Sequence, residues 1–419
     1  MGGFSEKLAW VLLGFFLGMN ISVAIVLGVL AALYALVFVF FCGAARPLVR
    51  SLVDVPLVSL RLQGCVAWSV LAYVGRGFKP RFPNWSLTFE VAARLMRFMF
   101  DQYGDVIAHE NAAMMRAPFA MHGKMILKSN CKLHGTRAEK LEAHGLDHWW
   151  LRDVDAAAGK PRLVVIHYHG GGFAMSDPLQ DVELANQTHS LLKQALRETH
   201  GIDVAVDVLL SNYRKAPEHP YPAPFDDCFA TYEHVLAHEQ LPPNRILLSG
   251  DSAGGWMSLA ICKRLRDAGR DADLPLAALL YSPLADFDEK GGDEKTPHCV
   301  LAAQFVDAVH NAYLAKLTDL AARREASPVN WDLTRLPPMF VQYGTEERFY
   351  EQGLRLKAIA DKQGVTNWEL DVLEGMPHDA AMFPTDVLPF AKEAIRHAAV
   401  FAAKRAAPVL AGEPEPEAK

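Results

Sequence analysis

Beyond residue 120, short apolar runs alternate with helical stretches along the chain. The middle runs, such as Leu163-Val-Val-Ile166 and Ile246-Leu-Leu248, are continuously apolar, which is typical of strands buried on both faces of a sheet. The pattern predicts strands at 124–128, 148–153, 163–168, 204–210, 245–248, 276–281, 339–343 and 368–373, separated by helices such as 182–199, 256–268 and 350–363. This βαβ alternation predicts a mainly parallel sheet with helices on both faces, and a ligand site beyond the carboxyl ends of its strands.

Three stretches do not fit that alternation. Residues 83–120 and 295–325 contain helical patterns, and we expect both to form a helical cap over the strand ends. Residues 51–75 are apolar with interspersed polar positions. They fit equally well a segment lying along a membrane surface and the start of the cap.

The amino-terminal region contains no charged residue from Leu8 to Cys42. A membrane-spanning helix needs about 20 apolar residues, so the run predicts one long tilted transmembrane helix, with a tight hairpin breaking near Gly18 as the alternative. A cleaved signal peptide would find small residues at Gly43-Ala44-Ala45, but its apolar core normally covers only about 7–15 residues. We therefore expect a membrane anchor.

The side of the membrane that holds the body of the protein is left open by the sequence. Arg46, Arg50 and Arg61 follow the apolar run, which for a single span favours a cytoplasmic carboxyl-terminal side. The glycosylation triplets at Asn84 and Asn186 would instead suit a lumenal domain.

Composition changes this picture little. Apolar residues make up 51% of the 419, in keeping with a membrane segment, and a net charge of −6 without a long basic run argues against nucleic acid as a partner. The six cysteines show no metal-type spacing and are interpreted as mostly free thiols, with one or two disulfides left open for an oxidising compartment. We expect an anchor at 1–45, a juxtamembrane segment and cap helices at 46–120, a catalytic domain at 121–405 with a cap insertion near 295–325, and a disordered tail at 406–419.

The strongest chemical motif is G-x-S-x-G, formed here by Gly250, Ser252 and Gly254. It follows the predicted strand 245–248 directly and precedes a helix, which is the context of a nucleophile on a strained strand-to-helix turn. The helix amino terminus places a positive field where oxyanion charge develops. We therefore predict Ser252 as the nucleophile.

A glycine-rich loop, His167-Tyr-His-Gly-Gly-Gly-Phe173, ends another predicted strand. Acyl transfer needs N–H donors around the tetrahedral oxyanion, and consecutive glycines leave such donors uncovered. We expect the N–H groups of Gly171, Gly172 and Ala253 to form the oxyanion hole. We expect His169 to shape the loop rather than act as a base.

The general base and the acid should follow the nucleophile in chain order. His378, in the loop after the last predicted strand, is the candidate base that takes the Ser252 proton. The loop after strand 339–343 contains no aspartate, and a carboxylate is needed there to orient the imidazole. We choose Glu347 as the acid, with Glu346 as the alternative.

Together these motifs resemble the hormone-sensitive-lipase family of α/β-hydrolases over roughly residues 120–400. His169-Gly170-Gly171-Gly172 is similar to the family's oxyanion loop, Gly250-Asp251-Ser252-Ala253-Gly254 to its nucleophile elbow, and Tyr213-Arg-Lys-Ala-Pro-Glu-His-Pro-Tyr-Pro-Ala223 to a structural signature. The family's acid loop usually reads Asp-x-Leu-x-Asp, whereas this chain has Glu347, Phe349 and Glu351 at those positions. The resemblance implies an α/β-hydrolase fold with a mostly parallel central sheet, an amino-terminal cap and no metal or other cofactor.

Within that family, an anchor followed by this body is similar to arylacetamide deacetylases and steryl acetyl hydrolases of the endoplasmic reticulum. The expected function is therefore that of a single-pass, membrane-anchored serine esterase that hydrolyses short-chain, acetyl esters of apolar alcohols such as sterols or xenobiotics. A long-chain acylglycerol lipase is one alternative. The other is a non-catalytic receptor for hydrophobic ligands on the same fold, which the presence of His378 makes the weaker alternative.

Overall fold

The computed structural model describes residues 25–412, apart from residues 27, 158 and 289–294. The chain divides into two units, residues 1–67 and 68–419, which are considered separately. Two helices, Gly28–Leu48 and Leu52–Gly75, are long and apolar enough to cross a membrane, although a signal sequence or the core helix of a soluble protein meets the same criterion. Residues 8–24 of the expected anchor lie outside the described residues.

The larger unit is built on one sheet, which has eight strands within the described part of the chain. Their order is β1-β2-β4-β3-β5-β6-β7-β8, and all neighbours from β4 to β8 are parallel, while β2 pairs antiparallel with β1 and β4. The strands are β1 (Thr136–Ala143), β2 (Leu146–Asp153), β3 (Arg162–Tyr168), β4 (Ala205–Ser211), β5 (Ile246–Asp251), β6 (Ala277–Tyr281), β7 (Met339–Gly344) and β8 (Trp368–Leu373). The predicted mostly parallel sheet is confirmed.

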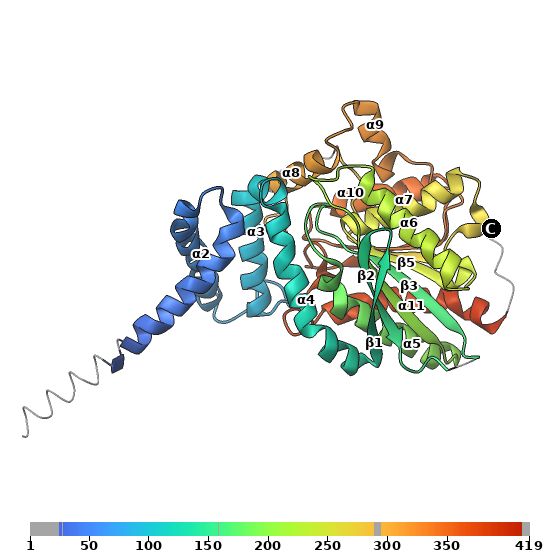
Figure 1. The fold of residues 1–419 in the computed structure, drawn as a ribbon, viewed down its shortest axis with the longest axis horizontal. Helices are drawn as coiled ribbons and strands as arrows, with labels where there is room; N and C mark the ends of the chain where they lie inside the picture. Colours follow the sequence, from blue (N-terminus) through green and yellow to red (C-terminus); the bar gives the residue numbers. More distant parts are fainter. Residues whose placement is uncertain (1–24, 27, 158, 289–294, 413–419) are drawn as a thin grey trace, which may run out of the picture. The chain divides into compact units, whose positions relative to one another are not determined.

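Helices cover both faces of this sheet, as parallel strands buried on two sides require. The described part of the chain as a whole contains the helices α2 (Val55–Gly75), α3 (Leu87–Ala108), α4 (Ala112–His134), α5 (Val182–His200), α6 (Ala223–His238), α7 (Ala253–Asp267), α8 (Ala303–Tyr313), α9 (Leu320–Glu325), α10 (Tyr350–Lys362) and α11 (Ala391–Ala411), and some of these pack on the sheet. In Figure 1, α5 and α11 lie on one face of the sheet, while α6, α7 and α10 lie on the other.

The predicted strand at 124–128 is wrong, because these residues lie inside α4. A short apolar run does not by itself distinguish a strand from a buried turn of helix, and the surrounding Ala, Met, Leu and Lys residues favour helix. The helix continues to His134 and ends where Gly135 adopts φ +70°, a left-handed cap that glycine allows. It therefore runs across the domain boundary that we placed at residue 120.

Strand β1 was missed, and α11 extends further than expected. The run Thr136-Arg-Ala-Glu-Lys-Leu-Glu-Ala143 carries too much charge to read as a strand, yet it pairs with β2 along its whole length at the edge of the sheet. Helix α11 continues to Ala411, beyond the boundary placed at residue 405, because its apolar side is buried. The end of the expected tail, residues 413–419, lies outside the described residues.

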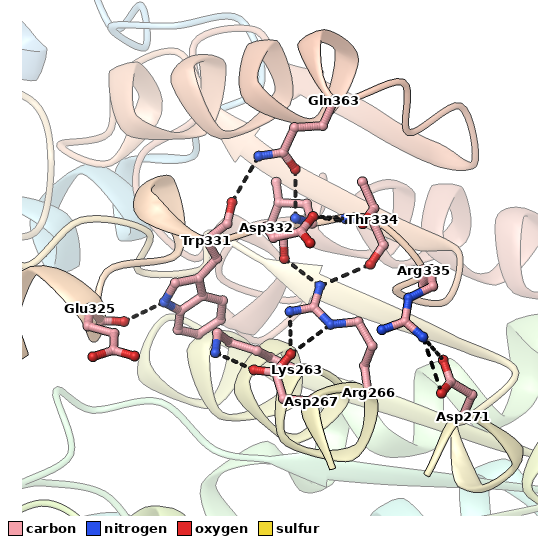
Figure 2. Close-up of polar contacts among 11 residues, drawn as sticks. Lys263, Arg266, Asp267, Asp271, Glu325, Trp331, Asp332, Thr334, Arg335 and Gln363 are labelled. Carbon is pink, nitrogen blue, oxygen red and sulfur yellow. Dashed lines mark hydrogen bonds and ion pairs between the residues drawn. The ribbon is translucent and has the colours of Figure 1, made fainter. Parts of the chain in front are cut away.

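Helix α7 is fixed at its carboxyl-terminal end by a network of polar contacts, which Figure 2 shows. The buried Arg266 side chain donates hydrogen bonds to the carbonyl oxygens of Asp332 and Thr334. Gln363, the residue after α10, donates a hydrogen bond to the carbonyl oxygen of Trp331 at 3.0 Å, in the residue just before Asp332. Because α7 begins immediately after Ser252, the Arg266 hydrogen bonds hold the helix whose first turn borders the nucleophile.

The two segments expected to form a cap meet each other. Helix α3 comes from the first segment and α8 from the second, and the rings of Phe100 and Phe305 stack with their centroids 4.1 Å apart. A Cβ atom on Gly104 would lie 2.8 Å from the Phe305 Cα atom, so glycine is what lets the two helices come this close.

Candidate active site

Ser252 occupies the strained turn that the sequence predicts between β5 and α7. Its backbone lies at φ +50° and ψ −110°, a conformation that an L-residue adopts only when its surroundings enforce it. Its N–H donates a hydrogen bond to the Tyr281 carbonyl oxygen at 2.8 Å. A Cβ on Gly254 would lie 1.8 Å from the Tyr168 carbonyl oxygen, which explains the need for glycine there.

His378 lies beside the nucleophile, although 126 residues separate the two in sequence. Its Nε2 atom is 3.0 Å from Ser252 Oγ, and both residues are buried. On the other side of the ring, Nδ1 lies 3.7 Å from Glu347 Oε1, which is an ion-pair distance rather than a hydrogen bond. The Phe349 and His378 rings pack in a T-shaped arrangement, with their centroids 4.9 Å apart.

Glu347 is held rigidly in place at the end of β7. Its Oε2 atom accepts hydrogen bonds from the Ser282 hydroxyl at 2.6 Å and from the Gly344 N–H at 3.0 Å. Glu346 is only half-buried, and the neighbouring Glu374 adds to the effect of its burial in raising its pKa. The structure thus brings Glu347, and not Glu346, to His378.

The ionisation of His378 is set by two carboxylates. Burial opposes the charged imidazole, but Asp379 and Glu347 outweigh burial and raise the pKa of His378 well above its ordinary value. Asp379 Oδ2 lies 3.0 Å from the same Nε2 atom that faces Ser252. The imidazole therefore has a carboxylate on each side.

The glycine loop lies against the nucleophile turn. The Gly170 N–H donates a hydrogen bond to Asp251 Oδ1 at 2.9 Å, and Gly171 and Gly172 adopt φ +98° and +61°. Gly171, Gly172 and Ala253 all border the same cavity as Ser252. As the first residue of α7, Ala253 presents an N–H group that has no acceptor within its own helix.

His169 supports this loop through its contacts with Tyr213. Its ring stacks on Tyr213 with a centroid distance of 4.3 Å, and the Tyr213 hydroxyl donates to the His169 carbonyl oxygen at 2.8 Å. Burial lowers the pKa of His169 well below its ordinary value, so the ring is neutral.

A buried cluster of His167, Asp181 and Asp251 links the loop to the nucleophile turn. His167 Nε2 lies 3.0 Å from Asp181 Oδ2 and 3.4 Å from Asp251 Oδ1, while its Nδ1 lies 3.0 Å from Ser249 Oγ. Burial disfavours a charged ring, but the two carboxylates prevail and raise the pKa of His167 to about 9. These three side chains also form a donor set that could hold a metal ion, but the hydrogen bonds of a protonated His167 account for their arrangement.

A cavity of about 290 Å³ opens above Ser252, at the carboxyl ends of the strands. The two cap segments contribute much of its apolar lining, with Met96, Phe100, Phe119, Phe305 and Val309 among the lining residues. The walls are therefore mainly apolar, as is usual for a small-molecule pocket.

Sequence reasoning missed several polar residues of this site: Ser282, Asp181, His167 and Asp379. Asp379 directly follows His378 and could have been suspected from that position alone. Ser282 sits just after β6, the strand end where catalytic side chains gather in this type of sheet, but a lone serine carries no pattern.

A comparison with known families matches residues 165–382, more than half of the chain, to a family described as having the alpha/beta hydrolase fold. An acetyl-hydrolase of Streptomyces hygroscopicus is 34% identical over 218 residues, which cover 51% of this chain and 66% of the relative. A carboxylesterase, NlhH, of Mycobacterium tuberculosis is 31% identical over 241 residues, which cover 55% of this chain and 70% of the relative.

Among solved structures, an esterase from the bacterial hormone-sensitive lipase family superposes with a TM-score of 0.56 and 26% identity. The match covers 83% of this chain and 97% of that one. That structure belongs to the same family that the oxyanion loop and the nucleophile elbow of this chain suggested. From its motifs, its sheet and its relatives, this chain belongs to the hormone-sensitive-lipase type of α/β-hydrolases and is a carboxylic ester hydrolase.

Proposed function

We propose that the protein hydrolyses short-chain, acetyl esters of apolar alcohols such as sterols or xenobiotics, using Ser252, His378 and Glu347. The observation that carries this proposal is the 3.0 Å approach of His378 Nε2 to Ser252 Oγ at the strained turn. A working base beside the serine also favours catalysis over a receptor that only binds hydrophobic ligands.

In the proposed mechanism, Ser252 Oγ attacks the acyl carbon while its proton passes to His378 Nε2. Glu347 orients the imidazole and stabilises the imidazolium, and the N–H groups of Gly171, Gly172 and Ala253 stabilise the oxyanion. The imidazolium returns the proton to the departing alcohol, which leaves an acyl-enzyme. Water, deprotonated by His378, then releases the carboxylic acid and restores the serine. His169, Gly170, Gly250, Asp251 and Gly254 support the geometry of these groups.

The size of the cavity supports a small acyl group. A volume of about 290 Å³ lies at the lower end of the range for ligand pockets. A long acyl chain, or a whole sterol, would fit in such a cavity only if the cap helices moved or part of the molecule stayed outside it. The volume therefore favours short-chain esters of small apolar alcohols.

We also propose that the amino-terminal helices anchor the protein in a membrane, that of the endoplasmic reticulum being the expected one. The support is the length and apolar composition of the helix Gly28–Leu48. A lipid-soluble ester would be concentrated at the same membrane.

The test is hydrolysis of p-nitrophenyl esters from acetate to palmitate by the detergent-solubilised full chain. Activity should be highest on the shortest esters and fall by about 10⁴-fold or more in Ser252→Ala, the order of loss seen when a serine nucleophile is removed. A maximum on palmitate would make the protein a lipase. Equal activity in Ser252→Ala would remove the serine from the mechanism.

A further inference from the structure

Helix α4 carries a methionine strip, Met114, Met121 and Met125, on its outer side. These side chains are 40%, 62% and 72% exposed. Because they are spaced by seven and four residues, they lie on one side of the helix. A shallow groove on the same helix is lined by Met121, Lys124 and Met125 among others. A single exposed apolar residue needs no explanation, but a strip of methionines beside a groove is typical of a surface that receives an apolar partner.

The helix that carries this strip is also basic. Lys124, Lys128 and Lys132 recur every four residues along it, and α4 contains no aspartate or glutamate. Lys128 lies about two turns beyond Met121, and Lys132 about two turns beyond Met125, so both lysines share the side of the methionines. None of the three lysines forms an ion pair with a carboxylate in the described part of the chain. Exposed apolar groups next to unpaired lysines complement a surface that is both apolar and negatively charged.

The cavity above Ser252 reaches the protein surface beside this strip. Of the described residues that line the cavity, only His122 is exposed. His122 directly follows Met121, and Phe119, another lining residue, belongs to the same helix. A partner that covers the methionines therefore lies at the entrance through which an ester reaches Ser252.

The lysines favour a lipid surface over a second copy of this chain as that partner. A two-fold contact pairs a surface with itself, so it would bring the lysines of two copies together with no carboxylate on α4 to neutralise them. A membrane surface meets both requirements, because its acyl region takes up the methionines while anionic head groups attract the lysines, whose long side chains extend to them. The membrane anchor proposed above would keep such a surface within reach.

We propose that the methionine strip and the lysines of α4 bind an anionic lipid surface, and that esters dissolved in that membrane enter the cavity beside His122 without passing through water. This inference rests on the proposed ester hydrolysis and membrane anchoring, and it names the partner at the entrance of the site. The preferred substrates are accordingly esters that partition into lipid.

Two acetate esters test the proposal on the full chain, reconstituted in vesicles of phosphatidylcholine and the anionic lipid phosphatidylglycerol. Octyl acetate dissolves in the bilayer, whereas p-nitrophenyl acetate reaches the enzyme from water. The double variant Lys124→Gln/Lys128→Gln should lower kcat/KM for octyl acetate by about tenfold or more, because each lysine near an anionic surface contributes to the attraction. Its kcat/KM for p-nitrophenyl acetate should change less than about twofold, because neither lysine lines the cavity.

The matched control, Lys362→Gln/Lys404→Gln, removes the same charge from α10 and α11, neither of which lines the cavity. It should leave both values unchanged. In vesicles of phosphatidylcholine alone, the wild type should lose its advantage over Lys124→Gln/Lys128→Gln on octyl acetate. Equal activity of these two proteins in the anionic vesicles would overturn the proposal, and so would a loss of the same size in the control.

Photocrosslinking gives a second measurement that needs no turnover. With p-benzoylphenylalanine in place of Met125, irradiation of the full chain in the anionic vesicles should give lipid adducts that mass spectrometry identifies. The same group in place of Val400, a 52% exposed apolar residue on α11, should not. Equal adducts at both positions, none at Met125, or crosslinks between two copies of the chain would contradict the lipid contact. If neither ester were hydrolysed but Met125 gave lipid adducts, the proposed function would fail while the lipid contact remained.

Discussion

The two carboxylates at His378 have different consequences for the imidazole. Glu347 faces Nδ1, the side away from the nucleophile, and its own position is fixed by Ser282 and Gly344. Asp379 faces Nε2, where it competes with Ser252 for the same nitrogen. Both raise the pKa of His378, but only Glu347 does so without occupying the reacting side of the ring.

Replacing Glu347 should therefore damage catalysis far more than replacing its neighbour. We expect Glu347→Gln to lower kcat by about 10²- to 10⁴-fold, since the imidazole loses both its orientation and its stabilising charge. Glu346→Gln, the matched control one residue earlier, should change kcat less than about threefold because that side chain does not reach His378. Steady-state kinetics with p-nitrophenyl acetate measure both, and equal losses would refute the assignment.

The rate should depend on pH through His378. The ring accepts a proton only when it is neutral, so a raised pKa keeps the base protonated and shifts the onset of activity to higher pH. Removing the charge in Asp379→Asn lowers the pKa of His378 and should move the acidic limb of the kcat/KM profile to lower pH. An unchanged midpoint would mean that Asp379 does not act on the ring.

At the scale of elements, the site depends on how closely helices approach the body of the protein. Helix α4 passes over the short helix that ends at Asp181, and a Cβ on Gly123 would lie 2.2 Å from the Leu179 carbonyl oxygen. The same helix supplies Phe119 to the cavity wall. The fit of α4 therefore affects both stability and the shape of the pocket.

Gly123→Ala should destabilise the protein by about 2 kcal/mol or more, because the added methyl group meets backbone rather than a flexible side chain. On the exposed side of the same helix, Ser129→Ala should be neutral or stabilise by a few tenths of a kcal/mol, since alanine is the better helix former. Chemical denaturation of both variants checks the pair. A neutral Gly123→Ala would show that α4 can shift without loss.

The elements that sequence patterns predict well are the buried ones. Strands such as β8 were placed correctly because they are bounded by clear turns, and the β5–α7 turn was found because G-x-S-x-G requires that context. The pattern failed at 124–128, where three apolar residues fit helix and strand alike, and at the charged edge strand β1. Asp379 and the His167 cluster escaped because their significance arises from side chains that meet only in three dimensions.

At the scale of the whole molecule, the structure removes one of the two glycosylation triplets as evidence on membrane topology. Asn186 lies in α5, fully buried, and donates hydrogen bonds to Asn130 Oδ1 and the Val182 carbonyl oxygen, so its glycosylation triplet is not accessible in the folded protein. Asn84 is exposed. Of these two triplets, the one at Asn84 can therefore report on which side of a membrane the folded domain lies.

A membrane anchor predicts that the full chain stays with membranes after extraction at alkaline pH, and that its intact mass includes the apolar run. A cleaved signal would instead give a chain shorter by about 45 residues, because small residues suited to cleavage lie at 43–45. Fractionation followed by mass spectrometry decides between the two. A full-length chain in the soluble fraction would refute both.

The catalytic groups and the cavity walls come from different parts of the chain. Ser252, Glu347 and His378 follow the ends of β5, β7 and β8, whereas much of the wall belongs to α3, α4 and α8. Mutations that enlarge, narrow or recharge the wall can therefore accumulate without disturbing the reacting atoms. Such a division lets substrate specificity diverge among related enzymes while the catalytic mechanism is retained.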